Sequence, residues 1–238
     1  MNFVLKLAAA ISVFHLLVSG SHGALIGQLG VLDSASNNGI NPTTGVAWKV
    51  GDAYRLTFIT STGIDGTSMN IADYDAHVQT LANSAGLGAG WKALVSTSAV
   101  SARDNTGTNP TSTGVGIFLM DGLTMVASNN SQLWNGSISG AILLDEAQAV
   151  KSTSAKVFTG TSSSGVAGLA MGSGGNATIG FAGNTAKWID AGKKNETDVY
   201  QIYAVSDVLF VAESIPEPSS VIMVACGAFL CLRRKRSE

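Results

Sequence analysis

The chain has 238 residues, of which 45% are hydrophobic and 13% charged, with a formal net charge of −2. This length suits one ordinary domain or two small ones, and the low share of charged residues leaves a surface made mostly of Ser, Thr, Asn and Gly. The composition lacks the basic excess of a nucleic-acid-binding protein and is too apolar for a disordered chain, so we expect no nucleic-acid partner.

The N-terminal segment, residues 1–23, has the layout of a secretory signal peptide. Lys6 precedes an apolar run from Leu7 to Val18, and small or polar residues follow up to Gly23. This run is too short for a resident membrane-spanning helix. We therefore expect the secretion machinery to export the chain, with cleavage between Gly23 and Ala24.

The exported part, residues 24–214, begins with an apolar stretch at 24–32 that predicts an early strand. The next clear element is the segment 53–60 (AYRLTFIT), in which large apolar residues alternate with Arg55 and Thr57. This period of two predicts a strand with one buried face.

The strongest helical pattern begins at Asn70, a good N-cap residue, and places Asp73 and Asp75 where the helix dipole favours anions. Apolar residues recur at helical spacing on one face: Ile71, Tyr74, Val78, Leu81 and Ala85. Either Gly86 or Gly88 is expected to end the helix.

Short strands between Gly-rich turns are predicted for the rest of the exported part, over 91–97, 114–120, 139–145, 156–160 and 198–211. The last of them is apolar on both faces and suits a central strand. The stretch between Gly160 and Asn184 predicts an irregular loop, and no long repeat is present. The pattern indicates one α+β domain with one main helix and several short, mostly antiparallel strands.

The C-terminal segment, residues 215–238, combines a Pro-Glu-Pro motif, an apolar stretch from Ser219 to Leu232 and a basic cluster. The motif is Pro216, Glu217 and Pro218, and the cluster is Arg233, Arg234, Lys235 and Arg236. The apolar stretch is shorter than the about 20 residues that a spanning helix normally needs. We expect a short hydrophobic transmembrane helix whose basic end stays on the cytoplasmic side.

These three parts, in this order, resemble the PEP-CTERM sorting signal of Gram-negative bacteria. The resemblance implies that exosortase, a membrane protease-transpeptidase, recognises the Pro-Glu-Pro motif and removes the tail. The protein would be anchored transiently in the inner membrane and then reach the cell surface or an exopolysaccharide matrix. The alternative is a plain C-terminal membrane anchor.

The interior, over residues 50–211, resembles a family of PEP-CTERM proteins from environmental bacteria. The shared segments are NIADYDAHVQ, WKALVST, ARDNTGTNP, IFLMDG, NSQLWNGSI, VFTGT and YAVSDVLFV. Their order is more distantly similar to C-type-lectin-like domains of secreted bacterial proteins, which implies that fold. The calcium motifs of lectins are absent, because Gly136 and not Asp follows Trp134-Asn135.

The residues with catalytic or metal-binding chemistry are few. Cys226 and Cys231 both lie in the tail, so disulfides, Cys-based zinc sites and Cys nucleophiles are excluded from the exported part. His77 has no Ser or Asp partner that spacing identifies, and Gly172–Gly175 lacks the Lys-Ser/Thr ending of a phosphate loop. We expect no catalytic residue, metal or cofactor.

Five residues are candidate ligand contacts. Trp134 and Trp188 lie in turn-rich segments, where an exposed ring could stack on a sugar, and Asn135 follows the first of them. Arg103 and Asp104 lie in a polar loop. The alternatives are core packing for the tryptophans and a side-chain network that fixes the loop for the charged pair.

The leading hypothesis is a non-enzymatic surface or matrix protein that associates with exopolysaccharide. A purely structural envelope component is the first alternative. The second is a secreted glycan hydrolase that uses two carboxylates, for which Asp145 and Glu146 supply one candidate pair.

Overall fold

The computed structural model describes residues 40–211, and this part of the chain has an α+β fold. The signal peptide, the apolar stretch at 24–32 and the sorting tail with its hydrophobic helix lie outside the described residues. Within 40–211, none of the helices is long and apolar enough to cross a membrane.

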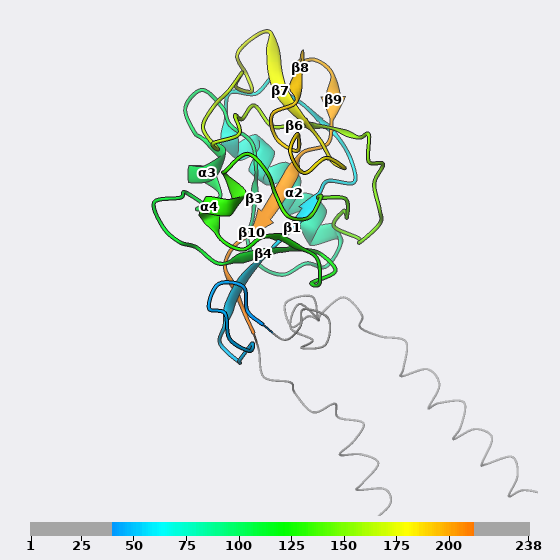
Figure 1. Cartoon of the computed structure of the whole chain (residues 1–238). Coiled ribbons are helices and arrows are strands. Elements are labelled where there is room, and N and C mark those ends of the chain that lie inside the picture. Colours follow the sequence, from blue (N-terminus) through cyan, green and yellow to red (C-terminus); the bar gives the residue numbers. More distant parts are fainter. Residues whose placement is uncertain (1–39, 212–238) are drawn as a thin grey trace, which may run out of the picture.

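Six strands form a mixed sheet at the centre of the fold (Figure 1). They are β1 (Ala53–Ile59), β3 (Trp91–Ala93), β4 (Gly116–Leu119), β5 (Met125–Ala127), β10 (Tyr203–Ser206) and β11 (Leu209–Phe210). The main path runs β3-β10-β1-β4-β5, and β11 pairs with the start of β1. Among the strand pairs of residues 40–211 only β1 and β4 are parallel, so the mostly antiparallel pattern is confirmed.

The central position of β1 explains why both of its faces are buried. Thr57 pairs with Val205 of β10 on one side and with Leu119 of β4 on the other. All residues from Leu56 to Ile59 are buried, so the prediction of a single buried face was wrong. The Thr57 hydroxyl donates a hydrogen bond to the Ala204 carbonyl oxygen at 2.7 Å, which satisfies its polar group inside the sheet.

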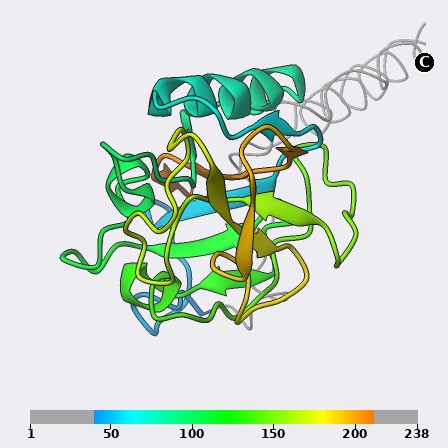
Figure 2. The same ribbon diagram turned by 90° about the horizontal axis from the view of Figure 1, so that it is seen from above.

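The main helix, α2 (Ile71–Ser84), begins as the sequence indicated and lies along one face of the sheet (Figure 2). The Asn70 side chain accepts a hydrogen bond from the Ala72 N–H at 3.2 Å. The buried residues of the helix are Tyr74, Val78 and Ala82. Tyr74 and Val78 of the predicted stripe are therefore buried against the sheet, and Ile71 and Ala85 pack partly on it, but Ala82 and not Leu81 completes the buried face.

Gly86, and not Gly88, ends this helix. Gly86 has a φ of 73°, a left-handed conformation that glycine adopts without steric cost. Its N–H donates to the Asn83 carbonyl, and the Leu87 N–H donates to the Ala82 carbonyl at 2.9 Å. These two bonds form a Schellman motif, which pairs carbonyls that a helix end leaves free.

Two smaller sheets and two single-turn helices complete the described chain. They are the sheet of β6 (Lys156–Phe158), β7 (Asn176–Phe181) and β8 (Gly192–Asn195), the pair β2 (Ile64–Asp65) and β9 (Val199–Tyr200), and the helices α3 (Ala102–Asn105) and α4 (Asn130–Leu133). β7 lies inside the stretch for which the sequence predicted only an irregular loop. It forms because its alternating apolar residues, Ala177 and Ile179, pack into the core.

Two further strand predictions need correction. Residues 139–145 form no strand, because Leu144 makes only an isolated bridge and its carbonyl accepts a hydrogen bond from the Ile59 N–H instead. The stretch 198–211 is divided into β9, β10 and β11. Of these, β10 is a central strand as expected, lying between β3 and β1.

The core consists of two clusters on the two faces of the central sheet. Successive strand residues alternate between them, as Phe58 and Ile59 do in β1. The helix-side cluster contains Leu56, Phe58, Tyr74, Val78, Phe118, Phe158 and Ile179 among others. The loop-side cluster contains Ile59, Ile117, Trp134, Ile142, Trp188 and Tyr203 among others. A helix and β6–β7 cover the first face, whereas mainly irregular chain covers the second.

Candidate functional site

The two tryptophans that we selected as exposed sugar-stacking residues are buried, so that prediction was wrong. Trp134 is 5% exposed and Trp188 is 0% exposed. Their ring centroids are 5.8 Å apart, and Trp188 lies another 5.8 Å from Tyr203. The loop-side cluster is covered mainly by irregular chain and by the single-turn helices α3 and α4, and these large rings pack inside it.

Trp134 is fixed by a hydrogen bond as well as by packing. Its indole N–H lies 3.0 Å from both the carbonyl oxygen and the hydroxyl of Thr108. Gly165 lies against the ring, and a Cβ built on this glycine would meet the Trp134 ring at 2.6 Å and Arg103 Cβ at 3.0 Å. The structure therefore brings Trp134 and Trp188 together, but as parts of the interior.

The other three candidate contacts do not form one site. Asp104 is exposed in α3 and accepts hydrogen bonds from Ser101 and Asn109 at 2.6 Å each. These two bonds hold the pKa of the Asp104 carboxyl below its usual value. Arg103 is partly buried, and Asn135 is exposed beside α4. The network around Asp104 supports the loop-fixing interpretation.

Three other acidic residues singled out in the sequence, Asp75, Asp145 and Glu146, also form hydrogen bonds or ion pairs within the domain. Asp75 reaches away from its own helix to accept hydrogen bonds from the Ala93 N–H and Asn105 Nδ2, and it forms an ion pair with Lys92 at 2.9 Å. The view of Asp75 as only a dipole partner was therefore incomplete. It joins α2 to the edge strand β3.

Asp145 and Glu146 are both buried. Asp145 accepts the N–H groups of Ala147 and Ala149 and pairs with Lys151 at 3.0 Å. Glu146 accepts the Ser61 N–H at 2.9 Å. Asp145 thus holds the loop at 145–151 together internally, and Glu146 fastens this loop to Ser61.

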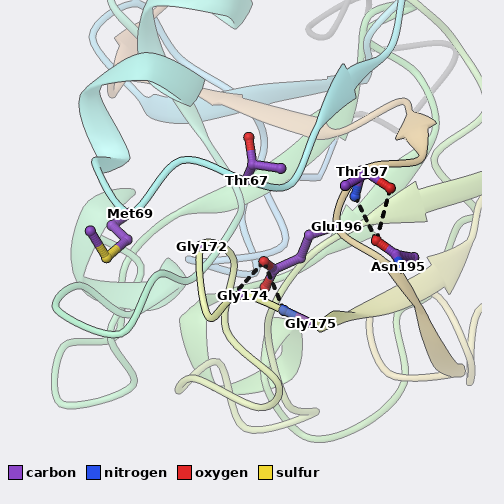
Figure 3. Close-up of a pocket in the computed structure, with 8 residues that line it drawn as sticks. All are labelled: Thr67, Met69, Gly172, Gly174, Gly175, Asn195, Glu196 and Thr197. Atoms are coloured by element: carbon purple, nitrogen blue, oxygen red, sulfur yellow. Dashed lines mark hydrogen bonds between the residues drawn. The ribbon is translucent and has the colours of Figure 1, made fainter.

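A surface cleft of about 380 Å³ lies elsewhere, where three segments meet (Figure 3). Residues 67–69 precede α2, residues 172–175 form a Gly-rich turn, and residues 195–197 join β8 to β9. Its volume falls in the range of small-ligand sites. None of the five predicted contact residues lines it.

Glu196 lines this cleft and holds the Gly-rich turn in place. Its side chain accepts hydrogen bonds from the Ser173 N–H and hydroxyl and from the N–H groups of Gly174 and Gly175, at 2.6 to 3.3 Å. Burial by itself would raise the pKa of the Glu196 carboxyl, but these bonds outweigh it and lower the pKa below its usual value. Glu196 is therefore a charged clamp for the Gly-rich turn.

The Gly-rich turn also packs directly on the segment before α2. The Gly172 N–H donates to the Gly66 carbonyl at 2.7 Å, and Gly172 has a φ of 71°. A Cβ on Gly172 would lie 2.5 Å from the Ser68 carbonyl oxygen. Only glycine fits here, so the walls of the cleft are held at a fixed separation.

Apart from Glu196, whose carboxylate is bound to the Gly-rich turn, the residues that line the cleft are neutral. Asn195 uses its side-chain oxygen to accept the N–H and hydroxyl of Thr197, at 2.9 Å each, and its Nδ2 has no partner among residues 40–211. The Thr67 side chain is exposed on the opposite wall, and Met69 is 69% exposed. Amide, hydroxyl and thioether groups suit an uncharged polyhydroxylated ligand.

Comparison of the sequence with family models and with curated proteins finds no match. The cleft therefore has to be interpreted from its own chemistry. Within the described range, no group of three or more His, Cys, Asp or Glu side chains is arranged to hold a metal ion.

Sequence reasoning missed the cleft because its walls come from three separate segments, 67–69, 172–175 and 195–197. One signal was present: the run Gly172-Ser173-Gly174-Gly175 offers several free N–H groups, and an acidic residue at 196 could satisfy them. Nothing local indicates that these two segments meet.

Proposed function

We propose that this chain is an exported protein, sorted by exosortase to the cell surface or extracellular matrix, that binds exopolysaccharide without catalysis. The observation that carries the binding role is the cleft, which combines a rigid Gly-rich wall, the Asn195 Nδ2 group without a partner among residues 40–211, and exposed Met69. Sugar hydroxyls bind well to such neutral groups, and the apolar face of a sugar ring packs on a thioether.

The order of elements supports the proposal of a C-type-lectin-like fold. β1, α2 and β3 occur in this order as strand, helix and tryptophan-containing strand, with the two-residue strand β2 between β1 and α2. The LWNG segment begins at the end of α4, and the FTGT segment begins at the end of β6. The engagement of Asp145, Glu146 and Glu196 in internal bonds supports a binding role over the hydrolase alternative.

The direct test measures binding of purified mature protein to the producer's extracellular polysaccharide, with and without EDTA. We expect saturable binding that EDTA leaves unchanged. A matched pair of variants locates the site. Asn195→Asp keeps the acceptor oxygen of the turn but removes the free Nδ2 donor. We expect at least about fivefold weaker binding, because the complex loses one hydrogen bond that contributes about 1 kcal/mol.

The control is Asn184→Asp, because the Asn184 side-chain oxygen likewise accepts two N–H groups, those of Ala186 and Lys187, in an exposed turn. It adds the same charge outside the cleft, so binding should be unchanged. Absence of saturable binding by the wild-type protein would favour a purely structural envelope component.

Sorting has a separate test in the producing cells. Replacing Pro216 and Pro218 by Ala should leave a heavier form that retains the tail. If the variant and the wild-type protein have equal mass, exosortase does not process this chain.

A further inference from the structure

One end of the domain exposes a group of apolar side chains, which we name the apolar end. It consists of Ile40, Val46, Val50, Val208 and Phe210, which are 45%, 47%, 60%, 38% and 60% exposed. In Figure 1 it is the lower end of the coloured part, where the blue and the last orange segments lie together. Contiguous exposed apolar surface usually marks an interaction site.

Backbone bonds hold this end together. The Gly51 N–H donates to the Val211 carbonyl, and the Val211 N–H donates to the Asp52 carbonyl, both at 2.9 Å. β11 then pairs Phe210 with Ala53 at the start of β1. Both ends of the described chain therefore emerge beside the same apolar side chains.

The end also carries little free charge. In the segments 40–52 and 207–211 the charged residues are Lys49, Asp52 and Asp207. The Asp52 side chain accepts hydrogen bonds from the Lys49 N–H at 2.9 Å and from Asn41 Nδ2 at 3.3 Å, so it is directed toward its own loop. A surface of this kind fits zwitterionic lipid better than a charged partner.

We propose that the apolar end rests on the lipid bilayer while the C-terminal tail is uncleaved. This inference depends on the anchoring role of the tail given under the proposed function. Only seven residues separate Val211 from Ser219, where the apolar stretch of the tail begins. Even fully extended, this linker spans at most about 28 Å, so the apolar end stays close to the headgroups.

The short tail gives a reason for a second contact. Its apolar stretch, as a helix, would be about 21 Å long at 1.5 Å per residue, against a hydrocarbon core of about 30 Å. Weak membrane anchors usually need a second signal for stable attachment. Burying Val50 and Phe210 at the interface supplies this second contact, and it also keeps the Pro-Glu-Pro motif close to the membrane surface.

The test uses the mature chain with its tail and vesicles of phosphatidylcholine and phosphatidylethanolamine. Flotation at several lipid concentrations gives the partition coefficient. The Val50→Ser/Phe210→Ser variant should partition about tenfold more weakly, as expected from the loss of part of two apolar side chains. The control Val150→Ser/Val199→Ser changes residues that are 74% and 63% exposed elsewhere, and should stay within twofold of wild type.

Equal partitioning of the two variants and the wild-type chain would overturn the inference while leaving the anchoring role of the tail intact. If the wild-type chain itself does not bind vesicles, the anchoring role fails as well. Gel filtration over a concentration range tests whether a second copy of the chain covers the apolar end instead. If the wild-type chain forms a dimer that Val50→Ser/Phe210→Ser dissociates and the control variant does not, the apolar end is a dimer interface and the lipid contact is overturned. Unfolding curves confirm that both variants fold.

Discussion

The helix-side and loop-side clusters lie on opposite faces of the same sheet and both contain buried aromatic rings, but different kinds of structure cover them. On the helix side α2 pairs its own backbone groups, and the Tyr74 hydroxyl donates to the Ser68 carbonyl at 2.9 Å. On the loop side individual contacts such as that of Trp134 with Thr108 have to fix the chain. Two buried polar atoms of this side, Trp188 Nε1 and the Tyr203 hydroxyl, have no partner among the described residues.

The difference teaches that a face covered by irregular chain depends more on single side chains. A helix supplies regular packing and satisfies its backbone at once, whereas each loop residue has to be placed by its own bonds. The following experiments test this comparison, from the largest expected effect to the smallest.

Trp134→Ala should lower the free energy of unfolding by about 3–5 kcal/mol, because it leaves a cavity and removes the hydrogen bond from the indole N–H to Thr108. Urea denaturation measures the change. Trp134→Phe should retain part of the packing and lose less. A loss below about 1 kcal/mol for Trp134→Ala would mean that the ring is not the anchor of the loop side.

Glu196→Gln should lower the free energy of unfolding by about 1.5–3 kcal/mol at neutral pH, since it removes the charge that three N–H groups and a hydroxyl share. The folded-state pKa of Glu196 is lowered, so its stabilisation is present above the unfolded-state pKa and is lost as pH falls through the folded value.

The difference between wild type and Glu196→Gln should therefore shrink in acid, below the usual carboxyl pKa of about 4.3. Unfolding curves at a series of pH values check this. Exposed Asp190→Asn serves as the control and should change stability by less than about 0.5 kcal/mol. A Gln variant as stable as wild type at pH 7 would contradict the clamp.

Gly86→Ala should cost about 1 kcal/mol, because alanine is strained at the positive φ of the helix C-terminus. Gly88→Ala is the matched control, since a Cβ there meets nothing within 4 Å. Thermal unfolding should show a lower Tm for the first variant and no loss for the second. Equal effects would place the end of α2 elsewhere.

Tyr203→Phe should leave the free energy of unfolding unchanged or raise it by up to about 1 kcal/mol, because the hydroxyl it removes is buried and without a partner among residues 40–211. Tyr74→Phe, on the helix side, should instead cost about 1 kcal/mol through the bond to Ser68. The two faces should thus respond to the same chemical change in opposite directions.

The elements that the sequence predicts well are those that local patterns specify. The alternation in 53–60 gives β1, and the cap at Asn70 and the helical stripe give α2. The sequence misses β7 and predicts a strand at 139–145 that does not form, because both outcomes depend on contacts with other segments of the chain. Strand formation is a property of pairing and burial more than of a short sequence.

The sequence by itself determined the helix, the central apolar strands and the lack of cysteine chemistry between residues 24 and 214, because each follows from residue type and short-range periodicity. Only the tertiary structure decided that Trp134 and Trp188 are buried and that Glu196 clamps the turn at 172–175. Burial and clamping depend on contacts between distant segments. A turn-rich sequence around a tryptophan does not reveal which side of the loop faces the core.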